Sequence, residues 1–116
     1  MFCAVLIRRL KEGASFEDFR KAWEPEPGHF GGPVRVTRAR RINDEREIVS
    51  FSLLDISAED LRASLERIAE GEKQRHERIA DIIETTVAAG IYEVIAEVEL
   101  SLTSAADGQR LARISS

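Results

Sequence analysis

The sequence predicts a small α+β domain with the ferredoxin-like element order β-α-β-β-α-β and an antiparallel sheet, and three observations support this. Residues 2–7 and 48–54 are apolar at nearly every position, which is typical of strands covered on both faces. Two helix-like segments with capping residues follow these runs. Two further strand-like segments carry more charge, as edge strands do. In the ferredoxin-like order the first and third strands are central, and here they are the most apolar.

Length and composition indicate a single domain. The chain has 116 residues, of which 43% are hydrophobic and 33% charged, and this allows one hydrophobic core in an ordinary globular protein. We expect the domain to span residues 1–100 and the polar residues 101–116 to form a C-terminal arm or tail. The net charge of −4 argues against nonspecific binding to nucleic acid or to an anionic membrane.

Cysteine usage and the length of the apolar runs indicate the compartment. Cys3 is the one cysteine in the chain, so no internal disulfide can form and nothing requires an oxidising environment. The first apolar run is shorter than a secretory signal, and its basic residues follow it instead of preceding it. No run approaches the roughly 20 apolar residues of a membrane span. We therefore expect a cytoplasmic protein with no membrane partner.

The first helix is predicted from a capping box, in which Ser15 is followed three residues later by Asp18. Three aromatic residues then share one helical face: Phe16, Phe19 and Trp23. Two prolines end the helix, because proline lacks an amide proton and clashes with the preceding turn. They lie in segment 24–33, which holds three prolines and three glycines and is the most loop-like stretch of the chain.

Residues 34–42 alternate β-branched residues with arginines and predict an exposed or edge strand. A polar turn at 43–46 joins this segment to the strand that ends near Ile56, so the two should form a hairpin. Several arginines in one strand would also suit an anionic ligand or RNA. The strand lacks the aromatic side chains on which single-stranded bases stack, and edge strands use charge to prevent aggregation. The interpretation as a solvated edge is therefore preferred.

Ser57 and Asp60 form a second capping box and open the second helix. Leucines and an isoleucine supply its apolar stripe: Leu61, Leu65 and Ile68. Gly71 then leaves two alternatives, either two helices that meet there or one long helix kinked there. The apolar face resumes beyond it as far as about Val87. Residues 91–100 alternate apolar side chains with glutamates and predict the last, half-exposed strand.

Two helices can cover only one face of a four-stranded sheet. The other face of the central strands is also apolar and needs its own cover. A two-fold partner that supplies the same surface is the simplest cover. The sequence therefore predicts a homodimer.

With this element order and burial pattern, residues 1–100 resemble the dimeric α/β-barrel superfamily. It includes antibiotic-biosynthesis-type monooxygenases, haem-degrading monooxygenases and stress-responsive barrel proteins. The resemblance implies that two sheets pack face to face as a barrel and that ligands lie between the helices and the sheet of each subunit. In the haem-degrading branch of this superfamily, a histidine and a tryptophan lie on the second helix and an asparagine lies in the first strand. Here His76 lies in the matching region, but the one tryptophan is Trp23 on the first helix and the first strand has no asparagine.

His76 is the first candidate site residue. If the second helix continues through Gly71, then Glu72, Arg75 and His76 interrupt its apolar face with polar groups, as a pocket wall would. A histidine there could act as a general base, as a metal or haem ligand, or as a hydrogen-bond donor. If the helix instead breaks at Gly71, the stripe rotates and His76 is solvated beside Glu72.

His29 is the second candidate, because binding residues concentrate in irregular loops such as 24–33. The alternative is an exposed loop histidine without a role. The aromatic cluster of the first helix is predicted to belong to the core or, alternatively, to line a cavity for a flat apolar ligand. The histidines, the cysteine and the carboxylates show no metal-ligand spacing, and no phosphate-binding glycine loop is present. We therefore predict no metal and no cofactor.

The sequence thus predicts a homodimer that binds a small, largely apolar or aromatic molecule, without naming a reaction. One alternative is a cofactor-independent monooxygenase that acts on an aromatic or polyketide-like substrate, with His29 or His76 as the base. Another is a structural or interaction module without a pocket. A cavity that contains a histidine and a second polar group would favour the enzyme, an apolar cavity would favour binding, and a filled core would leave the structural module.

Overall fold

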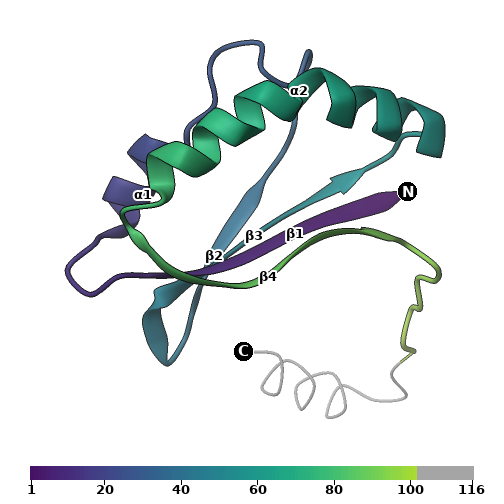
Figure 1. Ribbon diagram of the computed structural model, residues 1–116. Helices are drawn as coiled ribbons and strands as arrows, with labels where there is room; N and C mark the ends of the chain where they lie inside the picture. The colour runs from purple at the N-terminus through teal and green to yellow at the C-terminus, as the bar shows by residue number, and fades with distance from the viewer. Residues whose placement is uncertain (102–116) are drawn as a thin grey trace.

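The computed structural model describes residues 1–101, which form four strands and two helices (Figure 1). In chain order they are β1 (Phe2–Leu10), α1 (Phe16–Trp23), β2 (Thr37–Arg41), β3 (Asp44–Leu54), α2 (Ala58–Ile79) and β4 (Ile83–Glu93). Neither helix of this part of the chain has the length and apolar character needed to cross a membrane. The predicted C-terminal arm, from residue 102 onward, lies outside the described residues.

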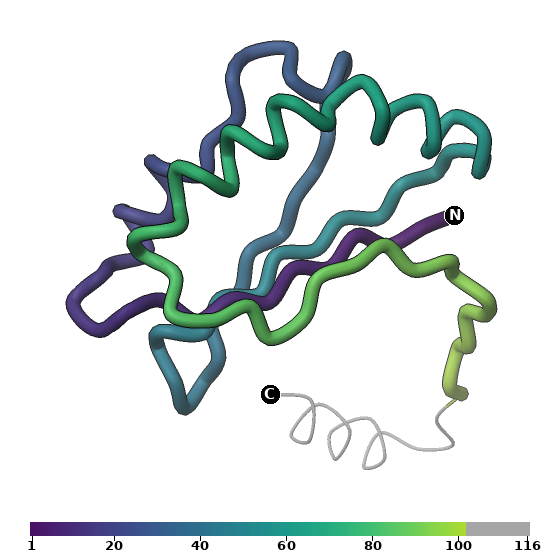
Figure 2. Tube along the Cα trace, viewed as in Figure 1, coloured from purple at the N-terminus to yellow at the C-terminus, as the bar shows by residue number. Residues whose placement is uncertain are grey.

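The strands form one antiparallel sheet in the order β2-β3-β1-β4. The two central strands pair from Phe2 opposite Leu54 to Arg9 opposite Glu47. Both helices lie on the same side of this sheet, with α2 running along it (Figure 2). The predicted α+β class, the ferredoxin-like order and the central place of the two most apolar strands are confirmed.

The predicted helix caps are present. Ser15 Oγ accepts the N–H of Asp18 at 3.1 Å, and the Asp18 carboxylate accepts the N–H of Ser15 at 2.9 Å, which completes the capping box. Ser57 Oγ likewise accepts the N–H of Asp60 at 3.1 Å, but the reciprocal hydrogen bond from the Ser57 N–H to the Asp60 carboxylate is not formed, so the second predicted capping box is only half present. α2 is a single helix that continues through Gly71, so of the two alternatives at Gly71 the one with two separate helices is excluded. Strong helix formers on both sides of Gly71 offset the roughly 1 kcal/mol cost of an interior glycine.

The prediction for residues 79–100 is wrong in its boundaries. α2 ends at Ile79, and β4 covers Ile83–Glu93 instead of 91–100. Isoleucines near the end of the helix continue its apolar spacing, but the threonines and valine that follow are β-branched and fit a strand equally well. Pairing with β1 along its whole length, from Leu10 opposite Ile83 to Phe2 opposite Glu93, decides in favour of the strand.

The hairpin of β2 and β3 is present with different bounds. β2 begins at Thr37, three residues later than predicted, and the turn consists of Ile42 and Asn43. β3 begins at Asp44 because Asp44 already pairs with Arg41 across the hairpin. Residues 44–46, which were predicted for the turn, therefore extend the third strand, and Asn43 alone of the predicted turn residues lies in the turn.

The hydrophobic core is small and lies between α1, the C-terminal end of α2 and the sheet. Its fully buried apolar residues are Leu10, Phe19, Trp23, Ile48 and Ile79. The predicted leucine stripe of α2 is only partly buried, since Leu65 is 42% exposed, whereas Arg75 of the same helix is buried. Polar side chains thus occupy space beside the core that apolar residues fill in most domains.

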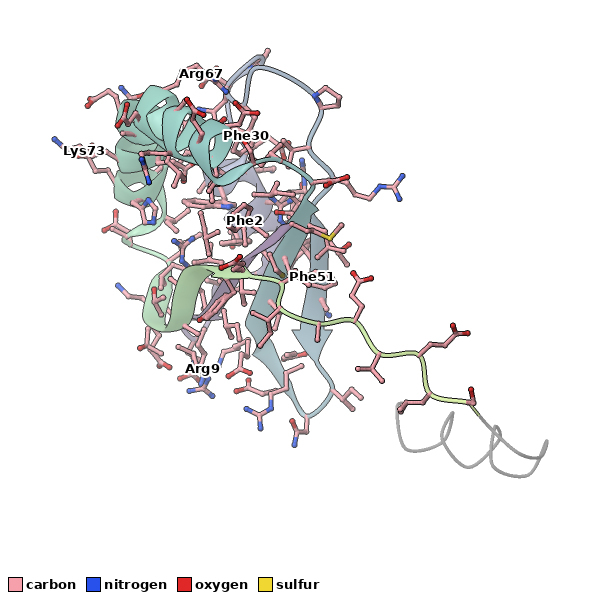
Figure 3. The ribbon with its side chains drawn as sticks, turned by 90° about the vertical axis from the view of Figure 1, so that its right-hand side faces the viewer. Phe2, Arg9, Phe30, Phe51, Arg67 and Lys73 are labelled. Atoms are coloured by element: carbon pink, nitrogen blue, oxygen red, sulfur yellow. The ribbon has the colours of Figure 1, made fainter. Side chains whose placement is uncertain are left out.

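The face of the sheet opposite the helices is apolar, as predicted. Strand alternation places Val5 and Ile7 of β1 and Val49 and Phe51 of β3 on this face. Phe51 is 38% exposed and its neighbour Leu53 is 61% exposed. Figure 3 shows Phe2 on the helix side of the sheet and Phe51 on the other side.

Candidate functional site

A group of charged and polar side chains lies between the helices and the sheet, around Trp23. We call it the arginine cluster, and its members are Arg8 of β1, Arg38 of β2, Glu72 and Arg75 of α2, and His29 of the loop between α1 and β2. Arg8 is 3% exposed and Arg75 is 6% exposed. Arginine is almost never buried this far unless it is paired.

The alternation of the strands brings Arg8 and Arg38 to the helix side of the sheet. Arg8 lies opposite Ile48 of β3, and Arg38 lies opposite Ser50 of the same strand. Both of these β3 residues are buried under the helices. Neighbouring strands are about 4.8 Å apart, so β1 and β2 are about 10 Å apart across β3. Two arginine side chains are long enough to approach each other over that distance.

Trp23 is packed against two of these guanidinium groups. The guanidinium carbon of Arg75 lies 3.8 Å from the centroid of the Trp23 ring, and that of Arg8 lies 4.3 Å away, which is the geometry of cation–π contacts. Phe19 stacks on the same ring with a centroid distance of 6.3 Å. The exposed fraction of Trp23 is 5%, so its place in the core is confirmed.

Arginines of α2 also bind the backbone at the end of α1 and in the following loop. Arg75 donates to the Trp23 carbonyl at 2.9 Å, Arg78 to the carbonyls of Ala22 at 3.0 Å and Glu24 at 3.2 Å, and Arg67 to the Phe30 carbonyl at 3.1 Å. The last carbonyls of a helix have no partner within it. These contacts therefore fix the end of α1 and the loop on α2, and Figure 3 shows Phe30 and Arg67 close together there.

Glu72 joins the loop histidine to the arginines. Its Oε1 accepts a hydrogen bond from Nε2 of His29 at 2.8 Å and another from Nη1 of Arg75 at 2.6 Å. Burial raises the pKa of the Glu72 carboxyl, but the hydrogen bond from His29 and the charge of Arg75 together hold it below its ordinary value. Glu72 is therefore an anion at neutral pH.

The arginine cluster carries more positive than negative charge. Burial, together with the nearby Arg75, lowers the pKa of Arg8 to about 10, although Glu72 opposes the shift. Burial also lowers the pKa of Arg75. Nη1 of Arg8 and Nε of Arg38 are buried and have no hydrogen-bond partner among the described residues. Three guanidinium groups thus face one carboxylate, and two of their donors are unused.

A shallow depression of about 130 Å³ opens beside Arg38. It is lined by Phe16, Arg38, Ala39, Arg40 and Ile48. Small-molecule sites usually measure about 300–1,000 Å³, so this depression fits one end of a ligand better than a whole ligand. Phe16 is the member of the predicted aromatic cluster that lines it, whereas Phe19 and Trp23 belong to the core.

The two predicted site histidines differ in burial. His29 faces inward, with 9% of its side chain exposed, and lies edge-on to Phe30. His76 is exposed and donates from Nδ1 to the Glu72 carbonyl at 2.7 Å. Glu72 and Arg75 therefore face inward as predicted for a continuous helix, while His76 is exposed but still lies edge-on to the Trp23 ring, with a centroid distance of 5.1 Å. Within residues 1–101, no three potential ligand side chains are grouped to hold a metal ion.

Sequence reasoning missed Arg8 and Arg38. In the sequence Arg8 is one of the basic residues after the first apolar run, and Arg38 is one of the charges of a predicted edge strand. A signal was available for Arg8, because it is in phase with Leu6 and Leu10 on the face that the helices cover. No comparable signal exists for Arg38, since its strand carries arginines on both faces.

We predict that Gly71→Ala displaces His29. A methyl group at Gly71 would overlap the His29 ring, whereas alanine by itself stabilises a helix interior by about 1 kcal/mol relative to glycine. Urea denaturation should therefore show Gly71→Ala raising the free energy of unfolding by about 1 kcal/mol in a His29→Ala background and clearly less in the wild type. An equal gain in both backgrounds would show that His29 does not pack on α2.

Comparison with protein-family models and with curated proteins gives no match to this chain. Solved structures do match it. A candidate antibiotic biosynthesis monooxygenase from Nitrosomonas europaea is 16% identical with a TM-score of 0.57, and the match covers 83% of this chain and 100% of that one. An uncharacterised NIPSNAP domain protein from Burkholderia xenovorans is 16% identical with a TM-score of 0.61, with coverage of 85% and 99%.

A third similar structure is a protein from Agrobacterium tumefaciens, which is 23% identical with a TM-score of 0.58 and covered over 92% of its length, against 80% of this chain. At these identities the likeness concerns the fold. The resemblance to antibiotic-biosynthesis-type monooxygenases drawn from the sequence is thus confirmed in the fold, and this chain is a ferredoxin-like α+β protein similar to those structures.

Proposed function

We propose that this protein is a homodimeric α/β barrel that binds a small organic molecule between its helices and its sheet. The observation that carries the proposal is the arginine cluster with its unused buried donors, one of which belongs to Arg38, a residue that lines an open depression. Buried polar atoms in native proteins nearly always have a hydrogen-bond partner, and an exception calls for a specific explanation. A ligand that enters from the depression would supply the partner.

The apolar face of the sheet supports the dimer. It presents half-buried and exposed side chains from both central strands, including Phe51 and Leu53. An apolar surface that extends across a sheet marks an interaction site in most proteins. A second copy related by a two-fold axis would offer the same surface in return, so the two sheets would form a barrel.

We expect Phe51→Glu to yield a monomer or an aggregate, because a dimer would bury the new carboxylate without a partner. Sedimentation equilibrium at micromolar concentration should show the wild type at twice the 13.0 kDa chain mass. Ile42→Glu is the matched control, since Ile42 is 90% exposed at the hairpin turn, and it should remain dimeric. A wild type found only as a monomer would contradict the dimer.

Ligand binding is tested through the fluorescence of Trp23, the one tryptophan of the chain. A screen of small aromatic compounds should contain binders that change its emission, because Trp23 contacts Arg8 and Arg75 directly. Binding should weaken in Phe16→Ala, which removes a side chain from the depression. Binders that leave Trp23 unaffected and that tolerate Phe16→Ala, His29→Ala and His76→Ala would place the site elsewhere. A screen without binders would favour a structural module.

The pair of His29 and Glu72 favours a second candidate, a cofactor-independent monooxygenase acting on an aromatic or polyketide-like substrate. A histidine held by a carboxylate is a common general-base arrangement, and the similar structure from Nitrosomonas europaea is a candidate antibiotic biosynthesis monooxygenase. This function ranks second because the other ring nitrogen of His29, Nδ1, packs against Gly71. Oxygen uptake with polyhydroxylated aromatic compounds that is lost in His29→Gln would support it.

A further inference from the structure

We propose that Nη1 of Arg8 and Nε of Arg38 bind an oxyanion, namely the carboxylate or phosphate group of the small molecule in the helix–sheet space. This inference rests on the proposed function and names the chemical class of its ligand. The inferred ligand differs from the largely apolar ligand expected from the sequence, because the charged side chains that reach this space from the sheet, Arg8 and Arg38, are cations.

The pairing inside the arginine cluster leaves Arg8 and Arg38 without an ion pair among the described residues. Glu72 accepts from Arg75 and from His29 at the same oxygen, so the one carboxylate of the cluster is engaged on α2. Arg8 has no ion pair within the described residues, and its Nη1 has no hydrogen-bond partner there. Glu72 only partly offsets the charge of Arg8. A buried cation without a paired counter-charge is unfavourable, and a bound oxyanion would reduce that penalty.

The location of the unused donors suits an acid group attached to an apolar body. Arg38 lines the depression and is also close enough to Arg75 to lower its pKa, so it connects the outer opening with the buried charges. Ser50 and Ser52 are buried on the same face of the sheet. Guanidinium groups bind carboxylate and phosphate oxygens in matched geometry. Phe16 and Ile48 offer apolar walls to the remainder of the ligand.

A purely structural role explains the arrangement less well. Arg75 contacts the Trp23 ring and also donates to the Trp23 carbonyl, so Trp23 is already held from α2. Arg8 adds a second guanidinium near the same ring and is repelled by the first, as the contribution of Arg75 to its lowered pKa indicates. An arginine kept for packing alone would have its donors satisfied by neighbouring carbonyls, as Arg78 has.

The test is calorimetric titration of the full-length protein with benzoate, phenyl phosphate, inorganic phosphate and the neutral analogue benzamide. We expect at least one organic anion to bind at least 10-fold more tightly than benzamide. Arg38→Met and Arg8→Met should each weaken that binding about 10- to 100-fold, the usual effect of losing a hydrogen bond to a charged group. Arg41→Met, which changes an exposed arginine of the same strand as Arg38, should leave it unchanged.

The ligands also separate the two sources of negative charge. Preference for benzoate assigns the site to carboxylates, and preference for phenyl phosphate or binding of inorganic phosphate assigns it to phosphates. Equal affinity for benzoate and benzamide, insensitive to Arg8→Met and Arg38→Met, would overturn the oxyanion site while the proposed function stands. Binding of neutral compounds alone would do the same. Absence of binding by every anion, together with a fluorescence screen without binders, would overturn both.

Discussion

Trp23→Ala is expected to lower the free energy of unfolding by about 3–5 kcal/mol, the usual cost of truncating a buried tryptophan. Trp23 is 5% exposed and stacks on Phe19, so the truncation leaves a cavity in a core with few other large residues. The same change also removes the cation–π partner of both Arg8 and Arg75. The two guanidinium groups, which repel each other, would then lose the aromatic ring that both of them contact.

Urea denaturation followed by circular dichroism measures this effect, because the variant lacks the fluorescent residue. Phe16→Ala is the matched control, since Phe16 is on the same face of α1 but only half-buried. It should lower the denaturation midpoint much less than Trp23→Ala. If Trp23→Ala unfolded at the wild-type midpoint, α1 would not be packed on the sheet through Trp23.

The order of the elements could be predicted because local signals and burial agreed along most of the chain. Ser15 and Ser57 mark both helix starts through side-chain caps, and the apolar runs mark both central strands. The boundary between α2 and β4 is wrong in the prediction because Ile79, Ile82 and Ile83 fit a helical spacing as well as they fit the end of a helix followed by a strand. The ladder between β1 and β4 resolves this ambiguity, and a long-range pairing of that kind has no signature in the local sequence.

The candidate site could be predicted only where one helix carries it. Glu72 and Arg75 are three residues apart on α2, so helical spacing alone places them on one face. Arg8 and Arg38 join them from two strands that are separated by β3 in the sheet. Their meeting depends on the pairing register. His29 reaches the cluster because Gly71 leaves room for its ring, whereas the sequence marks Gly71 as a break or a kink of the helix and gives no sign of the space that it provides.

Arg8→Met is expected to raise the free energy of unfolding by about 1–2 kcal/mol in the absence of ligand, although it removes a buried contact. Burial and Arg75 lower the pKa of Arg8 to about 10 in the folded protein, so the charged form is less favourable there than in the unfolded chain. That difference corresponds to roughly 3 kcal/mol, from which about 1–2 kcal/mol must be subtracted for the lost cation–π contact with Trp23. A methionine of similar length fills the same space.

The sign of the pH dependence distinguishes this cause from a general change in packing. Between pH 10 and the higher pKa of the unfolded chain, the unfolded state binds more protons at Arg8, so wild-type stability gains with rising pH. The advantage of Arg8→Met should therefore be constant at neutral pH and shrink as the pH rises above 10. Urea titrations of both proteins across this range measure the change in that advantage.

Arg9→Met is the control, since Arg9 is paired with Asp44 and Glu84 and its loss should not raise stability. A lower urea midpoint for Arg8→Met than for the wild type at neutral pH would show that Arg8 stabilises the fold. That result would contradict the premise that the charge of Arg8 is unfavourable without a bound anion.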